Sequence, residues 1–371
     1  MSGKKNQLSR RDFLKNSLLG LGSVWLAGQN QPIDRRLQDQ PINHLLPDQW
    51  QEDQLYGRVC EGKVNIFQRP SANSSILSAH YEDNIFPWLR EVVGDGSTPN
   101  RRWVETEAGY VYSPRIQPVR YQPNQPLTTL PDTARGRGMW AEVTVPYVPV
   151  TVANPPARAP WLRDNPAPRF YYSQIFWIDD IAVDADGRIF YHAVQQWGYG
   201  DEFWVSADAF RPLTDEELSP IHPEAENKRI RVSISYQTLS CLEDGREVYF
   251  CRVSTGQRFD AFGEEIDDYA TPLGGHRTWR KLISHHMSGG VSGYGWDLPG
   301  IAYTILFSGG GEAIHSTFWH NDFGVPRSRG CVNVSPKDAK WIFRWSEPYI
   351  PYDIGDITVS MPGGTVVEVV A

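Results

Sequence analysis

Short runs in which apolar and polar residues alternate recur along the chain from residue 56 onward. The runs at 64–70, 102–106 and 109–113 have the period of two that half-buried strands show. Gly94-Asp95-Gly96 supplies turn residues between the first two of them. We therefore predict a small β-module over residues 56–120 that closes with a 3₁₀-like turn and a last strand.

The same order of segments returns in the middle of the chain. Residues 189–194, 203–206 and 210–213 correspond in order to 102–106, 109–111 and 116–119. We therefore predict a second β-module over residues 134–226. The proline-rich stretch 121–133 is expected to link the two modules, and residues 146–168 to form a long loop within the second.

The pattern changes after residue 227. Residues 231–239 alternate as one strand, Asp244-Gly245 has the residues of a two-residue turn, and 247–253 return as the partner of a hairpin. Farther on, residues 335–345 predict a helix, with Ser335 at its N-cap, Pro336 at its first position and Asp338 in its first turn. The chain is thus expected to be mainly β, with one short helix near its end.

The first thirty residues have a different character. Arg10-Arg11 is followed by Phe13-Leu14-Lys15 and by a short, glycine-containing apolar run at 18–28. This resembles a twin-arginine export signal and predicts a protein of the cell envelope. The run is shorter than the roughly 20 residues of an ordinary membrane-spanning helix, and the small residues at Ala27-Gly28 make a poor cleavage site. Anchoring by an uncleaved signal therefore stays open.

Charge and cysteine content exclude several classes of protein. The net charge is −8 and becomes about −12 without the basic signal, which argues against nucleic acid as a partner. Four cysteines are too few for a fold built on disulfides. A two-residue turn at 244–245 would place Cys241 opposite Val248, so a bridge from Cys241 to Cys251 is not favoured.

The strongest chemical signal is a histidine placed sixteen positions before a cysteine. His315-Ser316 precedes Ser328-Arg329-Gly330-Cys331-Val332-Asn333, and no histidine follows Cys331. If this thiol is a nucleophile, its base must lie upstream, which reverses the order found in papain-like peptidases. A neighbouring imidazole can activate a thiol by forming a thiolate–imidazolium pair.

This arrangement resembles the signature of the L,D-transpeptidases, the cysteine enzymes of peptidoglycan cross-linking with a YkuD-type catalytic domain. The resemblance extends from Arg229 to about Gly355 and includes Ser254-Thr255-Gly256 and the segment 269–274. It implies a β-sandwich with a short helix after the catalytic cysteine, and no cofactor or metal. The two upstream modules resemble bacterial SH3-like barrels, which commonly bind wall polymers, although their aromatic residues are also expected as core.

The resemblance assigns roles to the residues of the motif. Cys331 would be the nucleophile, His315 the proton donor and acceptor, and Ser316 the residue whose carbonyl orients the imidazole. The backbone N–H groups of Gly330 and Cys331 would stabilise the oxyanion. At position 329 many members have histidine; an arginine cannot relay protons but can hold a carboxylate.

A groove for the substrate is expected beside this pair. The segment 281–287 resembles the part of the family that lines the acyl-donor groove, and 297–300 is expected to border the same cleft. Asn333 matches the terminal polar position of the motif and is expected to hold the loop. The substrate-binding residues predicted in this way are Arg329, His286, Met287, Tyr303, Trp319 and Asn333.

Other readings of these residues remain open at this stage. A cysteine after a glycine can be purely structural, and His315, His320 and Cys331 could hold a metal with His285 or His286. The absence of CxxC and HxxxH spacings disfavours the metal site. His320, Trp319 and Phe323 are expected to shape the loop rather than to react.

The sequence predicts an exported L,D-transpeptidase that joins stem peptides of peptidoglycan and is inhibited by β-lactams of the carbapenem type. Its partners would be a donor tetrapeptide and an acceptor amine. An L,D-carboxypeptidase and a non-catalytic wall-binding protein are the alternatives. The predicted parts are a signal at 1–29, a linker at 30–55, an SH3-like module at 56–120, a linker at 121–133, a second such module at 134–226 and a catalytic domain at 227–371.

Overall fold

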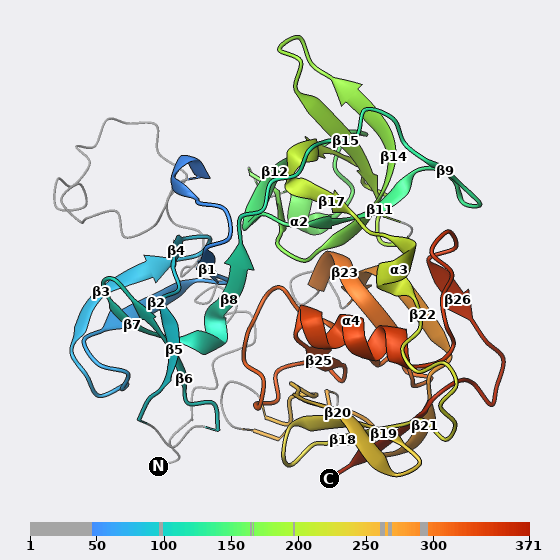
Figure 1. The fold of residues 1–371 in the computed structure, drawn as a ribbon. Helices are drawn as coiled ribbons and strands as arrows, with labels where there is room; N and C mark the ends of the chain where they lie inside the picture. Colours follow the sequence, from blue (N-terminus) through green and yellow to red (C-terminus); the bar gives the residue numbers. More distant parts are fainter. Residues whose placement is uncertain are drawn as a thin grey trace, which may run out of the picture. The chain divides into compact units, whose positions relative to one another are not determined.

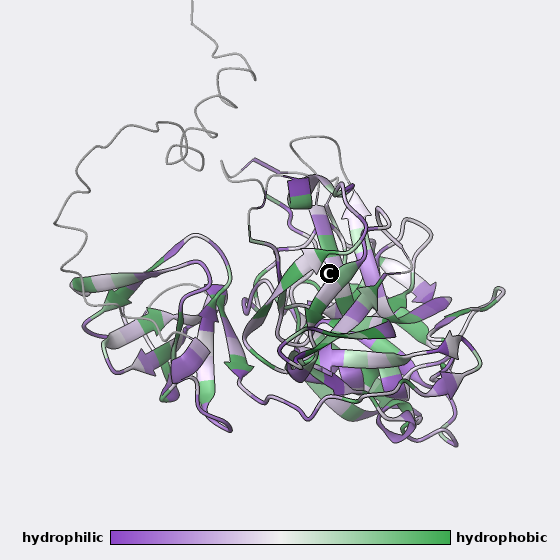
Figure 2. Ribbon diagram, turned by 90° about the horizontal axis from the view of Figure 1, so that it is seen from above, coloured by the Kyte–Doolittle hydropathy of each residue, from purple (hydrophilic) through white to green (hydrophobic). Residues whose placement is uncertain are grey.

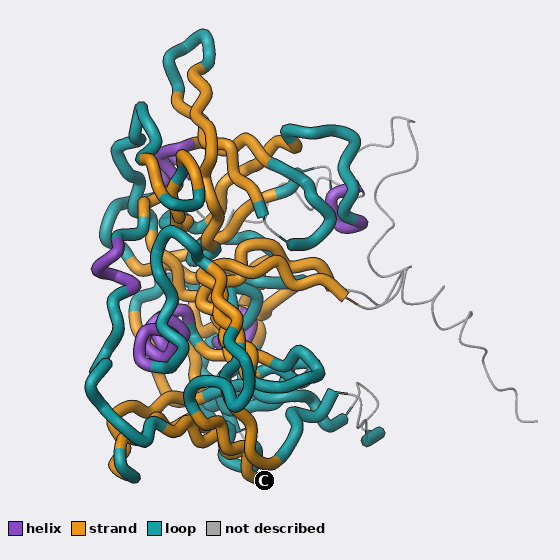
Figure 3. The backbone as a smooth tube through the Cα atoms, turned by 90° about the vertical axis from the view of Figure 1, so that its right-hand side faces the viewer, coloured by secondary structure: helices purple, strands orange, loops and turns teal. Residues whose placement is uncertain are grey.

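The structure is a computed structural model that describes residues 47–95, 99–163, 165, 167–195, 197–259, 264–265, 269–289 and 296–371 (Figure 1). The predicted signal at 1–29 and most of the predicted linker at 30–55 lie outside these residues. Strands dominate the described part, and its helices are few and short (Figure 3). None of the described helices has the length and apolar character needed to cross a bilayer.

The first β-module contains the predicted strands and the predicted 3₁₀ turn. A short 3₁₀ turn, η2 (Pro47–Gln49), precedes it, and Trp50 packs against Tyr121 and Tyr147, so the end of the predicted linker is ordered. Its strands form sheets in the orders β4-β1-β8 and β3-β2-β7-β6-β5. The elements are β1 (Leu55–Val59), β2 (Lys63–Phe67), β3 (Ile76–Tyr81), β4 (Ile85–Pro87), β5 (Arg90–Val93), β6 (Arg102–Thr106), β7 (Gly109–Tyr112), η3 (Ser113–Arg115) and β8 (Ile116–Arg120).

The second β-module repeats the strand–strand–3₁₀–strand order that the sequence predicts. Its main sheet has the order β13-β12-β16-β15-β14-β11-β17. The expectation of a long loop at 146–168 is wrong, because β12 and α2 lie there. The elements are β9 (Asp132–Thr133), β10 (Gly136–Arg137), β11 (Met139–Val143), β12 (Tyr147–Val152), α2 (Pro160–Arg163), β13 (Arg169–Tyr171), β14 (Ile175–Val183), β15 (Ile189–Val194), β16 (Phe203–Ser206), η4 (Ala207–Ala209) and β17 (Phe210–Pro212), followed by α3 (Asp215–Leu218).

The C-terminal domain is built on two sheets and one helix. The first sheet has the order β20-β19-β18-β27-β21, and the second β25-β24-β23-β22-β26. The last strand of the chain, β27, is inserted between β18, with which it runs parallel, and β21. The elements are β18 (Arg229–Ser233), β19 (Thr238–Glu243), β20 (Arg246–Arg252), β21 (Gly274–Arg277), β22 (Arg280–Gly289), β23 (Trp296–Leu306), β24 (Ala313–Ser316), β25 (Val332–Val334), α4 (Pro336–Trp345), β26 (Asp356–Thr358) and β27 (Val366–Val370).

The hairpin and the helix largely follow the prediction. Glu243 pairs with Arg246 around the turn, but a bulge then places Cys241 opposite Tyr249, and the expected single strand at 231–239 is broken into β18 and β19. All four cysteines are free thiols. In α4 the Ser335 hydroxyl accepts from the N–H of Asp338, which caps the helix as expected.

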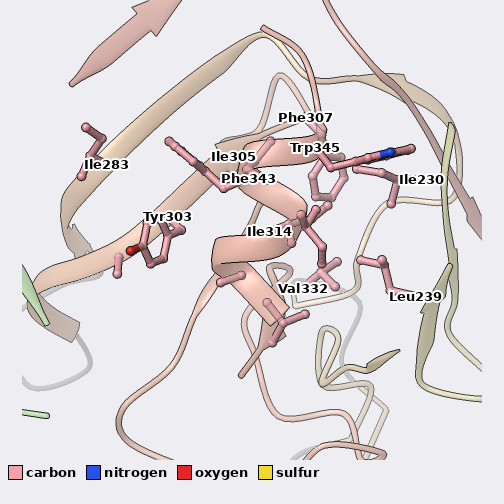
Figure 4. Packing of buried hydrophobic residues seen from close by; sticks show 14 of the residues in the cluster. Ile230, Leu239, Ile283, Tyr303, Ile305, Phe307, Ile314, Val332, Phe343 and Trp345 are labelled. Atoms are coloured by element: carbon pink, nitrogen blue, oxygen red, sulfur yellow. The ribbon is translucent and has the colours of Figure 1, made fainter. Parts of the chain in front are cut away.

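One hydrophobic core joins the two sheets and the helix. Ile230 and Leu239 of the first sheet meet Ile305 and Ile314 of the second around Phe343 of α4 (Figure 4). Hydrophobic and hydrophilic positions are interleaved along the ribbon (Figure 2), and in β18 buried residues alternate with exposed ones. The core also includes Trp140, Ile175, Trp177, Leu213 and Leu218, which come from the second β-module and α3. The second module and the C-terminal domain therefore share a core.

Candidate active site

Two parallel strands bring His315 and Cys331 to the same face of the second sheet. In the pairing of β24 with β25, Ile314 lies opposite Val332 and His315 opposite Asn333. Side chains alternate between the two faces of a sheet, so the fully buried pair Ile314 and Val332 faces the core. His315, Asn333 and Cys331, which comes just before β25, then point to the opposite face.

That face opens into a pocket of about 210 Å³ that contains both reacting groups predicted from the sequence. Strand β22 contributes one wall, the start of β23 another, and the segment between His315 and Cys331 a third. Four of the predicted substrate-binding residues line it, Met287, Trp319, Arg329 and Asn333. The lining residues are Met287, Trp296, Leu298, His315, Trp319, Arg327, Ser328, Arg329, Cys331 and Asn333.

The imidazole of His315 is held in one orientation by its neighbour. Its Nδ1 lies 2.8 Å from the carbonyl oxygen of Ser316. An acceptor at this distance requires the proton on Nδ1, so Nε2 carries the free lone pair. The side chain is buried, and burial lowers the pKa of His315 to about 4. The imidazole is therefore neutral at pH 7 and able to accept a proton.

The thiol of Cys331 is also neutral in the resting site. Burial raises its pKa to about 11; a backbone hydrogen bond from Ala313 acts in the lowering direction, and the nearby carboxylate of Glu312 raises it further. A preformed thiolate–imidazolium pair, as the sequence suggested, requires shifts in the opposite directions. The arrangement fits a neutral thiol beside a neutral base, with proton transfer during the attack on a substrate.

His320 fixes the chain at Asn333. Its Nδ1 accepts from the N–H of Asp322 at 3.1 Å, and its Nε2 lies 3.0 Å from the side-chain amide of Asn333. Because Nδ1 accepts, a neutral ring carries its proton on Nε2, and Asn333 accepts this proton only when its amide turns the oxygen toward the ring in place of Nδ2. Burial lowers the pKa of His320 to about 3, so it too is neutral. His320 and Asn333 thus contact each other at the base of the loop, where the sequence analysis expects them to shape and hold it.

Gly330 has a different environment from the one predicted. Its N–H donates to the Ser328 hydroxyl at 3.1 Å, so in this state it is not available to an oxyanion. Its carbonyl accepts from Thr271 at 2.9 Å, and the Ser328 hydroxyl donates to the Cys331 carbonyl. The backbone has φ +110°, which favours glycine, and a Cβ here would lie 3.0 Å from the side chain of Glu312, which would have to shift slightly.

Arg329 lies between two aromatic rings at the pocket. Its guanidinium carbon is 4.7 Å from the ring centroid of Trp296 and 5.1 Å from that of Tyr269. Stacking on aromatic faces orients a guanidinium and keeps its charge. The side chain is exposed at the edge of the pocket, where it can meet an anionic group of a ligand.

Two predicted groove residues do not line the pocket. His286 is buried, pairs with Asp297 and lies against Gly198 of the second β-module. Adjacent residues of a strand point to opposite faces, so Met287 lines the pocket and His286 points away from it; the register with β23 also shifts between His285 and Met287. Asp297, which pairs with His286, does not line the pocket either.

Tyr303 belongs to the hydrophobic core instead of the groove. It is 2% exposed, and its ring centroid lies 5.5 Å from that of Phe343. Its φ is +56°, an uncommon value for a tyrosine, and within the described residues its hydroxyl has no hydrogen-bond partner. The sequence of β23 does not alternate between apolar and polar residues here, so it does not show which face Tyr303 occupies.

The sequence analysis missed three residues that shape the site: Trp296, Arg327 and Thr271. Arg327 was detectable as a basic residue four positions before the cysteine, and Thr271 lies in the segment 269–274 that resembles the family. Trp296 lies 19 positions before His315, directly before the segment 297–300 that is expected to border the cleft. Among the described residues, no three His, Cys, Asp or Glu side chains are grouped so that they could hold a metal ion.

Comparison with known proteins agrees with the geometry. Residues 227–369 match the family model of the L,D-transpeptidase catalytic domain (YkuD). The chain carries an L,D-transpeptidase catalytic domain. Among curated proteins, none shows significant similarity to the chain.

Solved structures of L,D-transpeptidases resemble parts of the chain. A mutant of the Enterococcus faecium enzyme is 22% identical over 40% of this chain and 51% of its own, with a TM-score of 0.30. The L,D-transpeptidase from Mycobacterium smegmatis is 20% identical over 52% of this chain and 82% of its own, with a TM-score of 0.31. L,D-transpeptidase 3 from Mycobacterium tuberculosis, in complex with a faropenem-derived adduct, is 18% identical over 48% and 79%, with a TM-score of 0.30. The chain spans about half of the first of these proteins.

Proposed function

We propose that the chain is an exported peptidoglycan L,D-transpeptidase that forms 3→3 cross-links through a thioester on Cys331. The observation that carries the proposal is the parallel register of β24 and β25, which gives His315 and Cys331 one face and one pocket. The paired arginines Arg10-Arg11 support export by the twin-arginine route to the cell envelope.

The resting protonation states suit a reaction in which His315 acts first as a base. Nε2 of His315 takes the thiol proton while the sulfur attacks the carbonyl carbon of the diamino acid at stem position three. The tetrahedral intermediate collapses, the C–N bond to the terminal D-Ala breaks, and the departing amine takes the proton from His315. The stem tripeptide is left as a thioester on Cys331.

The second half of the reaction reverses these proton transfers. An amine of a neighbouring stem gives a proton to His315 and attacks the thioester carbonyl. The C–S bond breaks, the new amide is the cross-link, and His315 returns the proton to the sulfur of Cys331. Of the two backbone donors predicted for the oxyanion, the N–H of Gly330 is engaged by Ser328, so in this state the N–H of Cys331 is the predicted donor that remains.

The walls of the pocket fit a peptide donor with a charged group. Met287, Trp296 and Leu298 offer apolar contacts, and Arg329 offers a fixed cation for a carboxylate of the stem. A carbapenem presents an acyl group and a carboxylate in one small molecule. We therefore expect such compounds to acylate Cys331.

The test is turnover of disaccharide-tetrapeptide by the purified protein, followed by mass spectrometry. Cross-linked dimers are the expected product, and Cys331→Ala should lower their formation by at least ~10³-fold because the nucleophile is lost. Cys251→Ala, which removes a thiol of the core away from the pocket, is the matched control and should retain activity.

Other products would contradict parts of the proposal. Tripeptide without dimers would mean that water is the acceptor and that the enzyme is an L,D-carboxypeptidase. No product from folded protein, together with binding to isolated sacculi, would mean that the chain binds the wall without reacting.

A further inference from the structure

A buried arginine of the first β-module reaches the segment that separates the two reacting residues. Arg58 of β1 is 1% exposed, and its Nη2 donates to the carbonyl oxygen of Phe318 at 2.6 Å. Its other N–H groups donate to Gln117 at 3.0 and 2.9 Å and to Asp83 at 3.0 Å. The ring of Tyr171, from the second module, lies 4.1 Å from the guanidinium. These contacts together fix the orientation of the Arg58 guanidinium.

Further contacts from the same module follow along this segment. The carbonyl of Pro114 accepts from the N–H of Asn321 at 2.8 Å. The side-chain amide of Asn100 donates to Asp322 at 3.0 Å, and both residues are buried. The first β-module therefore contacts the segment at three places within five residues, and all of these contacts are polar.

The segment presents its other side to the reacting pair. The ring of Trp319, next to Phe318, lies 5.8 Å from that of His315, and both line the pocket. His320 holds Asn333, two positions after Cys331, through its Nε2. A shift of the Phe318 carbonyl would therefore be felt at both His315 and Cys331.

We propose that Arg58 is a positioning residue of the catalytic centre: by fixing the carbonyl of Phe318, it keeps Trp319 and His320 in place beside His315 and Asn333. The first β-module then completes the active site and is more than a wall-binding appendage. The inference rests on the proposed function for one reason: its kinetic test requires that the site turn over a substrate.

A purely stabilising role accounts less well for an arginine at this position. Removing a guanidinium from water is costly, and buried ion pairs such as Arg58 with Asp83 contribute little more than apolar side chains of the same size. A planar fork, however, fixes the direction of each acceptor that it binds. One N–H group of Arg58 donates to a backbone carbonyl of another domain, that of Phe318.

The experiment compares Arg58→Met and Arg58→Lys with a matched control in the full-length chain. Arg90→Met removes an arginine of the same module that is exposed and paired with Glu105. Three quantities are measured: the folded fraction, kcat and KM per folded enzyme with disaccharide-tetrapeptide, and hydrogen exchange of the amides at 317–323.

Arg58→Met should lower kcat per folded enzyme by roughly 10- to 100-fold, because small displacements of reacting groups have effects of this size. KM should stay within about threefold, and the amides at 317–323 should exchange at least ~10-fold faster. Arg58→Lys should recover part of kcat, since an ammonium can still reach one acceptor. Arg90→Met should behave as the unmodified protein.

Two results would overturn the inference. In one, the activity lost by Arg58→Met equals the loss of folded protein, so that kcat per folded enzyme is unchanged. In the other, exchange at 317–323 is the same in Arg58→Met and Arg90→Met. If the unmodified protein has no turnover, the proposed function fails, and the exchange comparison alone then decides whether Arg58 holds the segment.

Discussion

The two β-modules share an order of strands but meet the catalytic domain in different ways. The second places Trp140, Ile175 and Trp177 in the core of the catalytic domain, so that apolar burial joins them in addition to hydrogen bonds such as that from Gln174 to the carbonyl of Pro299. The first module meets residues 318–322, which lie between His315 and Cys331, through hydrogen bonds from Arg58 and Asn100. Apolar contacts are strong and non-directional, whereas hydrogen bonds contribute less free energy but fix geometry. One module should therefore govern stability and the other the geometry of the site.

The largest effect on stability is expected from the apolar junction. Trp177→Ala removes a side chain that is 5% exposed in the shared core and should lower the free energy of unfolding by about 3–5 kcal/mol. Urea denaturation followed by tryptophan fluorescence measures it. Trp204→Ala is the control, because Trp204 is half-buried on β16 and packs against His192 instead of this core. Equal losses in the two variants would mean that the shared core does not join the domains.

Acid should loosen the hydrogen-bonded contact between the first β-module and residues 318–322 before it loosens the shared apolar core. The pKa of His315 is lowered to about 4 and that of His320 to about 3, whereas an unfolded chain has a value of about 6.5. Below pH 6.5 the unfolded state binds more protons than the folded one, so the free energy of unfolding falls as the pH is lowered toward 4. Each unit of depression is worth about 1.4 kcal/mol.

Hydrogen exchange as a function of pH measures this order of release. Amides of residues 315–323 should lose protection at a higher pH than those of β14, which belongs to the apolar junction. His320→Gln should flatten the dependence, since it removes one of the histidines whose pKa is lowered by burial, His285, His315 and His320. A free energy of unfolding that is constant or rises between pH 6.5 and 4 would contradict the prediction.

The smallest effect on stability is expected from an exposed ion pair at the edge of the contact between the first β-module and the catalytic domain. Glu61 lies 3.4 Å from Arg327, and its side chain is 54% exposed. Exposed ion pairs contribute about 0–1 kcal/mol and are screened by salt. Glu61→Gln should therefore change the free energy of unfolding by less than about 1 kcal/mol, and a double-mutant cycle with Arg327→Gln should give no coupling in 1 M salt. A larger coupling would show that the rim, and not only the buried contacts, holds the module.

The sequence was most informative where local chemistry decides the structure. Asp244-Gly245 has the residues of a two-residue turn, and Ser335-Pro336 those of a helix start, and both form as predicted. The parts that failed depend on distant contacts. Gln237 adopts φ +52° without being glycine, since its side chain bonds to Ile234 and Thr255, and so it divides the strand expected at 231–239.

The candidate site shows the same division between local and distant information. His315, Cys331 and Arg329 lie in one short motif, and the structure brings them to one pocket. His286 was misplaced because it and Met287 are neighbours on β22, and neighbouring residues of a strand point to opposite faces. Arg58 gave no signal, because it lies 260 positions from the carbonyl that it binds. Spacing in a sequence cannot reveal a contact of that kind.

The place of β27 has a consequence for the order in which the protein can be completed. This strand follows the other described strands in the sequence, yet it lies inside its sheet, between β18 and β21. Until residues 366–370 have left the ribosome, both neighbours keep unpaired edges of the kind that invite aggregation. A nascent chain stalled before Val366 should therefore need a chaperone, even though both His315 and Cys331 have already been made.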